Sequence, residues 1–417
     1  MIHLRDYQRE ISAQAARLLE ERKICYLSME CRTGKTITAF EAARIYGAKR
    51  VLIVSKLKAL KGIADDYNAM SAQINPLFSL EMINYESAHK IAGAFDLVIL
   101  DEAHTLGAFP RPSKRAQELK RVCTGLPIIY LSGTPSPESF AQLFHQFWVS
   151  SFSPFQHRNF YVWAKDGFVN VRQKQINGYM INDYSDANEA KIKAIAGDLF
   201  LSYSQQDAGF FTLSDEYVLS VRMKQDTAQL FQMLKRDRVA RIGDFTILGD
   251  TPAKLLTKLH QISGGTIITE SGEHAILDAS KAEYIKRAFN GRKIAVFYVY
   301  QSEADLLYKV FPNHTEDAHT FQRSGSDCVF IAQVRKAREG VRLDTADALI
   351  FYNVEYSYLS YEQGKNRILS KEREAPAPVY FICSDCGIES AILDAVHHKK
   401  DFTLSYYRRY GKESRPA

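Results

Sequence analysis

The sequence has no hydrophobic run that approaches the roughly 20 residues needed to cross a membrane. Its first residues include Arg5, Asp6 and Arg9, so we expect no secretory signal peptide there. The six cysteines, from Cys25 to Cys386, form no framework of close spacings, which excludes a small disulfide-stapled fold. Fixed-period repeats and low-complexity segments are also absent. We therefore expect a protein of the reduced cytoplasm without a membrane partner.

The remaining composition is that of an ordinary globular enzyme. The chain has 417 residues, of which 46% are hydrophobic and 24% are charged. This length favours two or three domains, each large enough to bury a core. The net charge of +6 is a mild bias toward polyanionic partners.

One short stretch organises the sequence. It consists of Arg32, Thr33, Gly34, Lys35 and Thr36. An apolar run at 24–28 precedes it and a helix-like run at 37–43 follows, which is the context of a phosphate-binding loop. The loop N–H groups and the helix N-terminus would both face an anion. Lys35 would contact the β- and γ-phosphates, and the Thr36 hydroxyl would bind Mg²⁺. Met29 stands where such loops usually begin with glycine.

Two adjacent acids follow a second apolar run. Residues 97–100 are all apolar, as in a buried parallel strand, and Asp101 and Glu102 come directly after them. Ligand chemistry in α/β sheets gathers at the carboxyl ends of the strands. Asp101 could hold Mg²⁺ through water, and Glu102 could accept a proton from an attacking water. The alternative is a pair of solvated acids at a strand end.

Strand-like and helix-like runs alternate at both ends of the chain but not in its middle. Further strands are expected at 51–55, 82–85 and 127–131, and later at 294–299, 328–332, 348–352 and 379–382. This alternation predicts an α/β fold with two parallel-sheet domains, at 1–148 and 286–417. The aromatic-rich segment 149–285 is expected to be a mainly helical insertion, with helices near 187–203, 225–241 and 255–262.

The second α/β domain has no phosphate loop of its own. Such a pair of domains suggests a cleft enzyme in which the second domain supplies a cation to the transferring phosphoryl group. The segment 363–373 is the candidate source, and its alternative is a solvated helix face of mixed charge.

Taken in order, these segments resemble the motifs of superfamily-two helicases and translocases. The matching segments are Leu4 to Gln8, Arg32 to Thr36, Asp101 to His104, Ser132 to Thr134, Ile294 to Tyr300, Ala337 to Leu343 with Ala346 and Asp347, and Gln363 to Arg367. Asn84-Tyr85-Glu86 and Tyr356-Ser357 are similar to the Snf-type branch, and most of all to compact phage-encoded DEAH-box DNA helicases. The resemblance implies two RecA-like domains that use ATP and Mg²⁺.

The resemblance also implies roles for individual residues. ATP binding falls to Gln8, which would read the adenine edge, and to Arg32, Thr33, Gly34, Lys35, Thr36, Asp101, Glu339 and Gly340. Catalysis falls to Lys35, Glu102, Arg367 and Arg373, and Mg²⁺ binding to Thr36 and Asp101. Coupling of nucleotide state to nucleic acid falls to His104, Ser132, Thr134 and Gln363.

The last motif departs from the family pattern. Its second arginine should fall at position 370, where the chain has Ser370, and Lys371 and Arg373 are the nearest substitutes. Arg367 is therefore predicted as a phosphate contact and Arg373 as an additional finger. The choice matters because a guanidinium forks onto phosphate oxygens, whereas lysine offers only a point charge.

Two basic segments are candidates for contact with nucleic-acid phosphates. Lys114 and Arg115 follow the Asp-Glu-Ala-His motif, and Arg408 and Arg409 lie in an aromatic and basic C-terminal tail. The tail could instead be a solvated helix with a frayed end. Cys383 and Cys386 form a Cys-x-x-Cys, which could bind zinc with downstream histidines or simply end a buried strand.

The predicted function is a DNA translocase or helicase that couples Mg-ATP hydrolysis to movement on, or remodelling of, duplex or branched DNA. Its setting would be phage replication and recombination in the host cytoplasm, with proteins of those processes as possible partners. One alternative is a DNA or RNA helicase that acts on single strands and separates them from their partner strands. Another, of a different class, is an ATP-dependent clamp or adaptor without motor activity.

Overall fold

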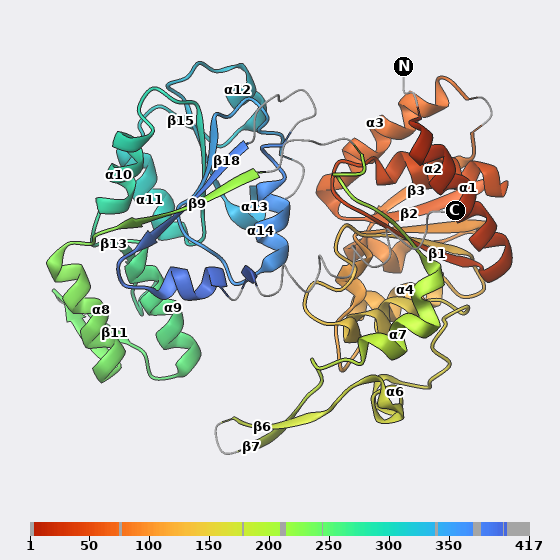
Figure 1. Ribbon diagram of the computed structural model, residues 1–417, viewed down its shortest axis with the longest axis horizontal. Helices are drawn as coiled ribbons and strands as arrows, with labels where there is room; N and C mark the ends of the chain where they lie inside the picture. Colours follow the sequence, from red (N-terminus) through yellow and green to blue (C-terminus); the bar gives the residue numbers. More distant parts are fainter. Residues whose placement is uncertain are drawn as a thin grey trace. The chain divides into compact units, whose positions relative to one another are not determined.

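The structure, a computed structural model, describes residues 4–74, 77–176, 179–208, 214–243, 245–337, 341–369, 377–394 and 396–397. The chain divides into two compact units between Gly209 and Phe210 (Figure 1). Each unit contains one six-stranded sheet in which every pairing is parallel. Two α/β domains were predicted from the alternation of strand and helix signals, and the structure confirms them.

The first sheet has the strand order β3-β2-β4-β5-β1-β8. Its strands are β1 (Ile24–Met29), β2 (Arg50–Ser55), β3 (Ser79–Asn84), β4 (Leu97–Asp101), β5 (Ile128–Leu131) and β8 (Phe200–Tyr203). The helices of this unit are α1 (Asp6–Arg22), α2 (Lys35–Tyr46), α3 (Leu60–Ser71), α4 (Lys114–Val122), α5 (Leu143–Trp148), α6 (Phe160–Trp163) and α7 (Glu189–Ala196). A separate antiparallel hairpin consists of β6 (Arg172–Ile176) and β7 (Tyr179–Asp183).

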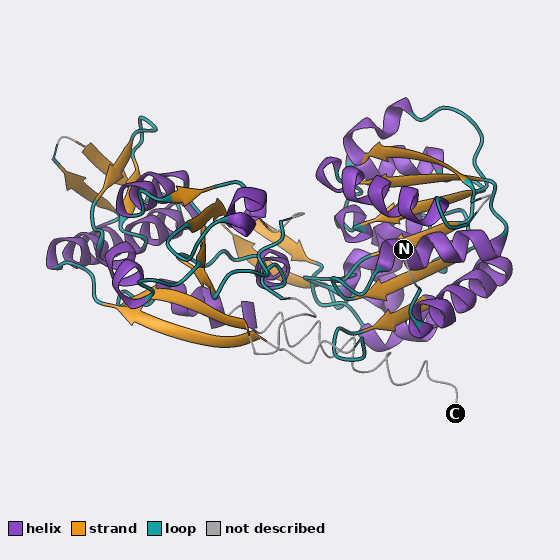
Figure 2. Ribbon diagram, turned by 90° about the horizontal axis from the view of Figure 1, so that it is seen from above, coloured by secondary structure: helices purple, strands orange, loops and turns teal. Residues whose placement is uncertain are grey.

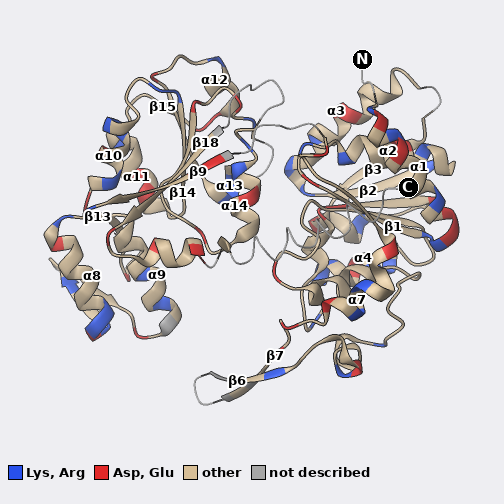
Figure 3. Ribbon diagram, in the orientation of Figure 1, with Lys and Arg blue, Asp and Glu red and all other residues tan. Residues whose placement is uncertain are grey.

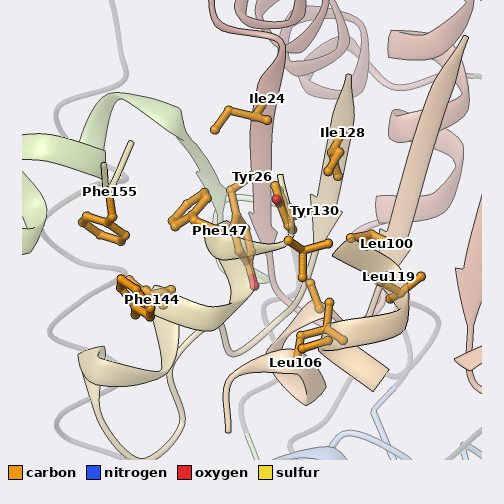
Figure 4. Close-up of a cluster of buried hydrophobic side chains, with 14 of the residues drawn as sticks. Ile24, Tyr26, Leu100, Leu106, Leu119, Ile128, Tyr130, Phe144, Phe147 and Phe155 are labelled. Carbon is orange, nitrogen blue, oxygen red and sulfur yellow. The ribbon is translucent and has the colours of Figure 1, made fainter. Parts of the chain in front are cut away.

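Both faces of the first sheet are covered, which explains the continuous apolar runs of its central strands. Along β1, Cys25 and Leu27 pack with α1 and α2 on one face, while Ile24 and Tyr26 pack on the other. This second face rests on aromatic side chains from α5 and the segment after it, among them Phe147 (Figure 4). Figure 2 shows helices on either side of these strands.

The second sheet has the order β15-β16-β14-β17-β18-β9. Its strands are β9 (Ser214–Val221), β14 (Ile294–Tyr298), β15 (His314–Thr315), β16 (Val329–Gln333), β17 (Ala348–Phe351) and β18 (Ala377–Ser384). Two hairpins accompany it, β10 (Val239–Ile242) with β11 (Phe245–Leu248), and β12 (Thr266–Ile268) with β13 (His274–Ile276). The helices are α8 (Gln225–Asp237), α9 (Pro252–Ser263), α10 (Ser280–Ala288), α11 (Gln301–Val310), α12 (Ala318–Arg323), α13 (Val334–Ala337) and α14 (Tyr358–Lys365).

The segment 149–285 differs from the mainly helical insertion that was predicted. Its described residues divide between the two units, and they contribute β8 to the first sheet and β9 to the second. The helix expected at 187–203 ends at Ala196, and the chain then enters β8. The prediction was wrong because the aromatic residues show no strand-like alternation, and the segment was therefore assigned to helices. They fill the core under the first sheet, where Phe155, Phe160 and Trp163 are buried.

Among the described residues, no helix combines the length and the apolar character that a membrane span requires.

Candidate active site

The loop predicted to bind phosphate, called the phosphate loop below, lies between β1 and α2, at the carboxyl edge of the first sheet. Met29, at the place of the missing glycine, is the last residue of β1, and its side chain is fully buried in the core. The loop therefore starts one residue later, at Glu30, and needs no glycine at its first position. Its turn instead uses left-handed backbone at Arg32, with φ of 64°, and at Gly34, with φ of 82°.

Gly34 is the residue at which this loop requires glycine. A Cβ built there would lie 2.2 Å from Nε2 of Gln8, in addition to the cost of its positive φ. Gly34 also precedes the first residue of α2, so the N–H groups of the first helical turn open toward the loop. A helix N-terminus of this kind attracts phosphate.

Hydrogen bonds within the loop set its shape. The Thr33 hydroxyl donates to the Glu30 carbonyl at 2.7 Å, and Lys35 Nζ donates to the same oxygen at 3.3 Å. Lys35 and Thr36 are both partly exposed at the start of α2. The Lys35 ammonium therefore lies over the loop, where it could also contact a phosphate bound there.

A clamp from the end of β8 holds the loop, and no local pattern in the sequence predicts it. The Glu30 N–H donates to the Tyr203 carbonyl at 2.9 Å, and the Gln205 N–H donates to Glu30 Oε2 at 2.7 Å. The Gln205 side chain also donates to the Cys31 carbonyl at 2.9 Å. No local pattern could reveal these contacts, because β8 follows β1 by more than 170 residues and lies beside it only in the sheet.

The glutamine segment at the start of α1 packs against the phosphate loop. Gln8 is buried, its Oε1 accepts the Arg5 N–H at 2.9 Å, and its Nε2 lies 3.4 Å from the Thr33 carbonyl. The Tyr7 hydroxyl donates to the same carbonyl at 2.9 Å. The Tyr7 ring stacks on Tyr203 with centroids 4.1 Å apart. The predicted adenine-reading residue is therefore adjacent to the phosphate loop, and its role as a reader stays a prediction.

The acid pair lies at the end of β4. The Ser55 hydroxyl, from the end of β2, donates to Asp101 Oδ2 at 2.6 Å, and the buried Tyr85 hydroxyl donates to the Asp101 carbonyl at 2.5 Å. Burial and then the charge of Glu102 raise the pKa of Asp101 from 3.8 to about 6, against the opposing effects of Ser55 and Lys35. A carboxylate held at this electrostatic cost is suited to receive a cation.

Glu102 stands at a sharp turn directly after the strand. Its φ is 52°, an uncommon left-handed conformation for a residue with a side chain. A short 3₁₀ turn, η3 (Ala103–Leu106), follows it. Because the chain turns directly after Glu102, both acids remain at the carboxyl edge of the sheet.

A buried polar link joins the acid pair to the loop after β5. Nδ1 of His104 lies 3.2 Å from Glu102 Oε2 and 2.9 Å from Ser132 Oγ. Ser132 Oγ also accepts the Thr134 N–H at 3.1 Å. A Cβ on Gly133 would lie 3.5 Å from Lys35 Nζ, so this loop also reaches the phosphate loop. The structure thus brings together the predicted coupling residues of the first unit.

The basic residues after the acid pair begin α4. Ser113 caps this helix by accepting the Ala116 N–H, and Lys114 and Arg115 are exposed in its first turn. Arg115 pairs with Glu86 at 2.5 Å. Their proposed contact with nucleic acid stays a prediction.

The predicted residues of the second unit are described only in part. Gln363 is buried on α14, and Arg367 Nε donates to its carbonyl at 3.1 Å. The Arg367 carbonyl accepts the Leu343 N–H at 3.0 Å, which ties Arg367 to the end of the preceding matched segment. The predicted residues Glu339, Gly340, Arg373, Arg408 and Arg409 lie outside the described residues, as does Ser370.

The Cys-x-x-Cys motif ends a buried strand. Cys383 lies on β18, and burial raises its pKa; burial also raises the pKa of Cys386, to about 11. Within the described part of the chain, no group of three or more His, Cys, Asp or Glu side chains is arranged to hold a metal ion.

Comparison with known proteins identifies the architecture. No family model and no curated protein matches the sequence. Among solved structures, the chain is similar to the Pyrococcus furiosus Hef helicase domain, with 13% sequence identity and a TM-score of 0.52. The match covers 94% of this chain and 98% of that one. The chain has the fold of a helicase core. At this level of identity the shared property is the fold, and the chemistry has to be argued from the residues.

Proposed function

We propose that this protein is a nucleic-acid-stimulated ATPase that moves on, or remodels, duplex or branched DNA. One observation carries the proposal: the phosphate loop with Lys35, the acids Asp101 and Glu102, and the His104–Ser132 link meet at one edge of one sheet. A helicase fold with this constellation supports ATP hydrolysis coupled to movement.

The residues at this edge fit Mg-ATP. Lys35 and the N–H groups of the first turn of α2 would hold the β- and γ-phosphates, and Gly34 leaves the backbone close enough for them to do so. Thr36 and Asp101 would hold Mg²⁺, which neutralises phosphate charge when it is bound. The raised pKa of Asp101 agrees with this assignment, because a bound cation would offset the repulsion from Glu102.

Glu102 would accept the proton of the attacking water. His104 would couple the protonation state of Glu102 to the loop of Ser132 and Thr134, because its Nδ1 lies 3.2 Å from Glu102 Oε2 and 2.9 Å from Ser132 Oγ. Gln8 would read the adenine edge beside the loop. Arg367, with Arg373, would supply positive charge to the γ-phosphate during transfer.

Duplex or branched DNA is the proposed track, in agreement with the Snf-like segments, and phage replication and recombination is the proposed setting. The decisive measurement is the steady-state ATPase rate at fixed low salt, with no polymer, single-stranded DNA, linear duplex, a DNA fork and RNA. We expect the highest rates on duplex or fork. Lys35→Ala should abolish turnover, and Lys286→Ala, an exposed cation of α10, serves as the matched control.

The other outcomes separate the alternatives. Rates that rise mainly with RNA or single-stranded DNA would favour a strand-unwinding helicase. Nucleotide binding without turnover on any polymer would contradict motor activity and favour a clamp or adaptor.

A further inference from the structure

Three polar side chains are buried in and beneath the loop that follows β5, and we refer to them as the buried network. They are Tyr26 of β1, Ser132 of the loop and Gln146 of α5, and each is 0% exposed. The Tyr26 ring is stacked on Tyr130 in an aromatic core, with centroids 5.5 Å apart (Figure 4). Because an unpaired polar group in such a core is costly, these side chains need specific partners.

Gln146 ties the loop to α5. Its amide nitrogen donates to the Pro135 carbonyl at 2.7 Å and to the Gln142 carbonyl at 3.1 Å, and its Oε1 accepts the Tyr26 hydroxyl at 2.7 Å. Pro135 directly follows Thr134, one of the predicted coupling residues. The end of the coupling loop is therefore bonded to a buried amide, and that amide is itself held by β1.

The Tyr26 hydroxyl also lies near the acid pair. Burial raises the pKa of Tyr26 well above its ordinary value, the interaction with the Ser132 hydroxyl opposes this rise, and the charge of Glu102 adds to it. Ser132 Oγ lies 2.9 Å from Nδ1 of His104, and this nitrogen lies 3.2 Å from Glu102 Oε2. Polar contacts therefore connect Glu102 to Gln146 through the core of the first unit.

The same helix, α5, also holds the segment that follows the acid pair. Nδ1 of His145 lies 2.6 Å from the Ala108 carbonyl oxygen, and burial lowers the pKa of His145 to about 4, so the neutral ring donates this bond. A Cβ on Gly107, at the end of η3, would lie 3.0 Å from Gln146 Nε2 and 2.8 Å from a backbone oxygen just before α5. One helix thus packs tightly against both the turn after the acid pair and the loop after β5.

This double attachment restricts how the loop can move. A loop held only at Ser132 could follow His104 without displacing anything else, whereas a loop also bonded to Gln146 has to move together with its surroundings. Packed cores change between discrete arrangements and resist gradual deformation. A change in the contact between Glu102 and His104 would therefore shift the loop as a whole.

We propose that Tyr26 and Gln146 are positioning residues, which keep Ser132 within reach of His104 and so transmit the state of the nucleotide site to bound DNA. The proposal rests on the proposed function, because it takes DNA as the track and the His104–Ser132 contact as the coupling link. It adds two residues outside the segments that match the helicase motifs.

The substitutions that test this proposal do not alter charge. β1 and α5 contain no Lys, Arg, Asp or Glu, and β1 is accordingly tan in Figure 3. Changes at Tyr26 and Gln146 to uncharged residues therefore leave the net charge as it is. This matters because DNA affinity depends strongly on protein charge.

The test uses the full-length chain and two variants of the buried network. Tyr26→Phe removes only the hydroxyl, and Gln146→Met removes the amide at similar volume. The matched control is Tyr130→Phe, at the tyrosine stacked on Tyr26, whose hydroxyl makes no hydrogen bond to the loop within the described residues. Thermal melting checks that each variant is folded, and if Gln146→Met does not fold, Tyr26→Phe decides the outcome.

The main readout is the affinity for a labelled DNA fork, measured with a non-hydrolysable ATP analogue and without nucleotide. In the wild type we expect the two affinities to differ about fivefold or more. Each network variant should bring this ratio about threefold or more closer to 1. A general loss of stability would not change the ratio, because it lowers both affinities alike.

Steady-state kinetics complete the test. The fork-stimulated ATPase rate of both network variants should fall about threefold or more, while KM for ATP and the rate without DNA stay within about twofold of the wild type. Tyr130→Phe should behave as the wild type in every assay.

The outcomes separate this inference from the proposed function. A wild-type affinity ratio and wild-type stimulation in the folded network variants would overturn the role of Tyr26 and Gln146 and leave the motor intact. An equal loss in Tyr130→Phe would also overturn it, because any change in this core would then suffice. A wild-type chain that neither binds the fork nor is stimulated by it would overturn the proposed function together with this inference.

Discussion

The two units carry six-stranded parallel sheets of the same kind, but the polar groups at their carboxyl edges are arranged differently. In the first unit Asp101 stays partly exposed beside Glu102, and its pKa is raised to about 6. At the corresponding edge of the second unit Glu303 is fully buried. Its Oε2 accepts the N–H groups of Val299 and Tyr300, at 2.8 and 3.0 Å, and Asn353 donates to Oε1 at 2.6 Å.

This difference in carboxylate partners indicates which of the two sheet edges is suited to bind a ligand. Burial raises the pKa of Glu303 too, but the protein itself supplies the partners of this carboxyl group. Ser55 and His104 also contact Asp101 and Glu102, but these two acids are adjacent, and Lys35 of the predicted phosphate loop lowers the pKa of Asp101. We infer that the second sheet uses its edge for stability and the first uses its edge for ligands.

The largest expected effect comes from replacing one carboxyl group in each unit with an amide. Glu102→Gln should lower kcat for ATP by about 100-fold or more, because it removes the proton acceptor, and should leave the protein folded. Glu303→Gln should instead lower the free energy of unfolding by about 1–3 kcal/mol, since an amide cannot match all three donors. Steady-state ATPase assays and chemical denaturation measure the two effects. A comparable loss of kcat in folded Glu303→Gln would erase the distinction between the two edges.

A buried ion pair in the second unit gives the next prediction. Lys281 Nζ lies 3.0 Å from Glu389 Oε1, and both side chains are fully buried. Lys281→Met would leave the Glu389 charge without its ionic partner and should destabilise the second unit by about 3–5 kcal/mol. Urea denaturation should show the loss in one transition, with nucleotide binding by the first unit retained. If Glu389→Gln added to Lys281→Met restored none of the stability, the buried charge would not be the cause.

The raised pKa of Asp101 predicts a trade between stability and activity. Because the native pKa of about 6 exceeds the ordinary value of 3.8, the native state holds this proton more tightly than the unfolded state. Its contribution to stability is therefore lost as pH rises from about 4 to 6. Asp101→Asn should stabilise the Mg²⁺-free protein at pH 8 by about 3 kcal/mol, at 1.36 kcal/mol per pKa unit, while ATPase activity disappears. Melting curves with a chelator from pH 4.5 to 8 measure this; a constant difference between variant and wild type over that range would refute the assignment.

The smallest expected effect concerns the clamp from β8. Gln205→Ala removes the side-chain hydrogen bond to Cys31 in the loop and should raise KM for ATP about tenfold, or roughly 1.4 kcal/mol, with kcat nearly unchanged. Ser204→Ala is the matched control, since its hydroxyl donates to Asp207 at 2.6 Å and not to the loop. A fall in kcat without a change in KM would assign Gln205 a role other than holding the loop.

Much of the fold could be predicted because the signals were local. The runs that end at Asp101 and at Leu131 are apolar along their whole length, as strands buried on both faces must be. The strand, loop and helix around Gly34 were likewise predictable, because glycine, lysine and threonine at this spacing after an apolar run are typical of a phosphate-binding loop. Local patterns failed at β8 and β9, whose short runs lie among aromatic and charged residues.

The sequence by itself determined the two α/β units, the phosphate loop and the acid pair, since backbone sterics and burial act over a few neighbouring residues. The tertiary structure decided which distant groups complete the site. Ser55 and Tyr85 reach Asp101, and Gln205 reaches the phosphate loop, only because parallel strands bring their carboxyl ends to one edge. It also decided that the aromatic segment after α5 would fill the core of the first unit and not form a separate domain. That outcome depends on the burial of its rings against the first sheet, and such packing leaves no periodic trace in the chain.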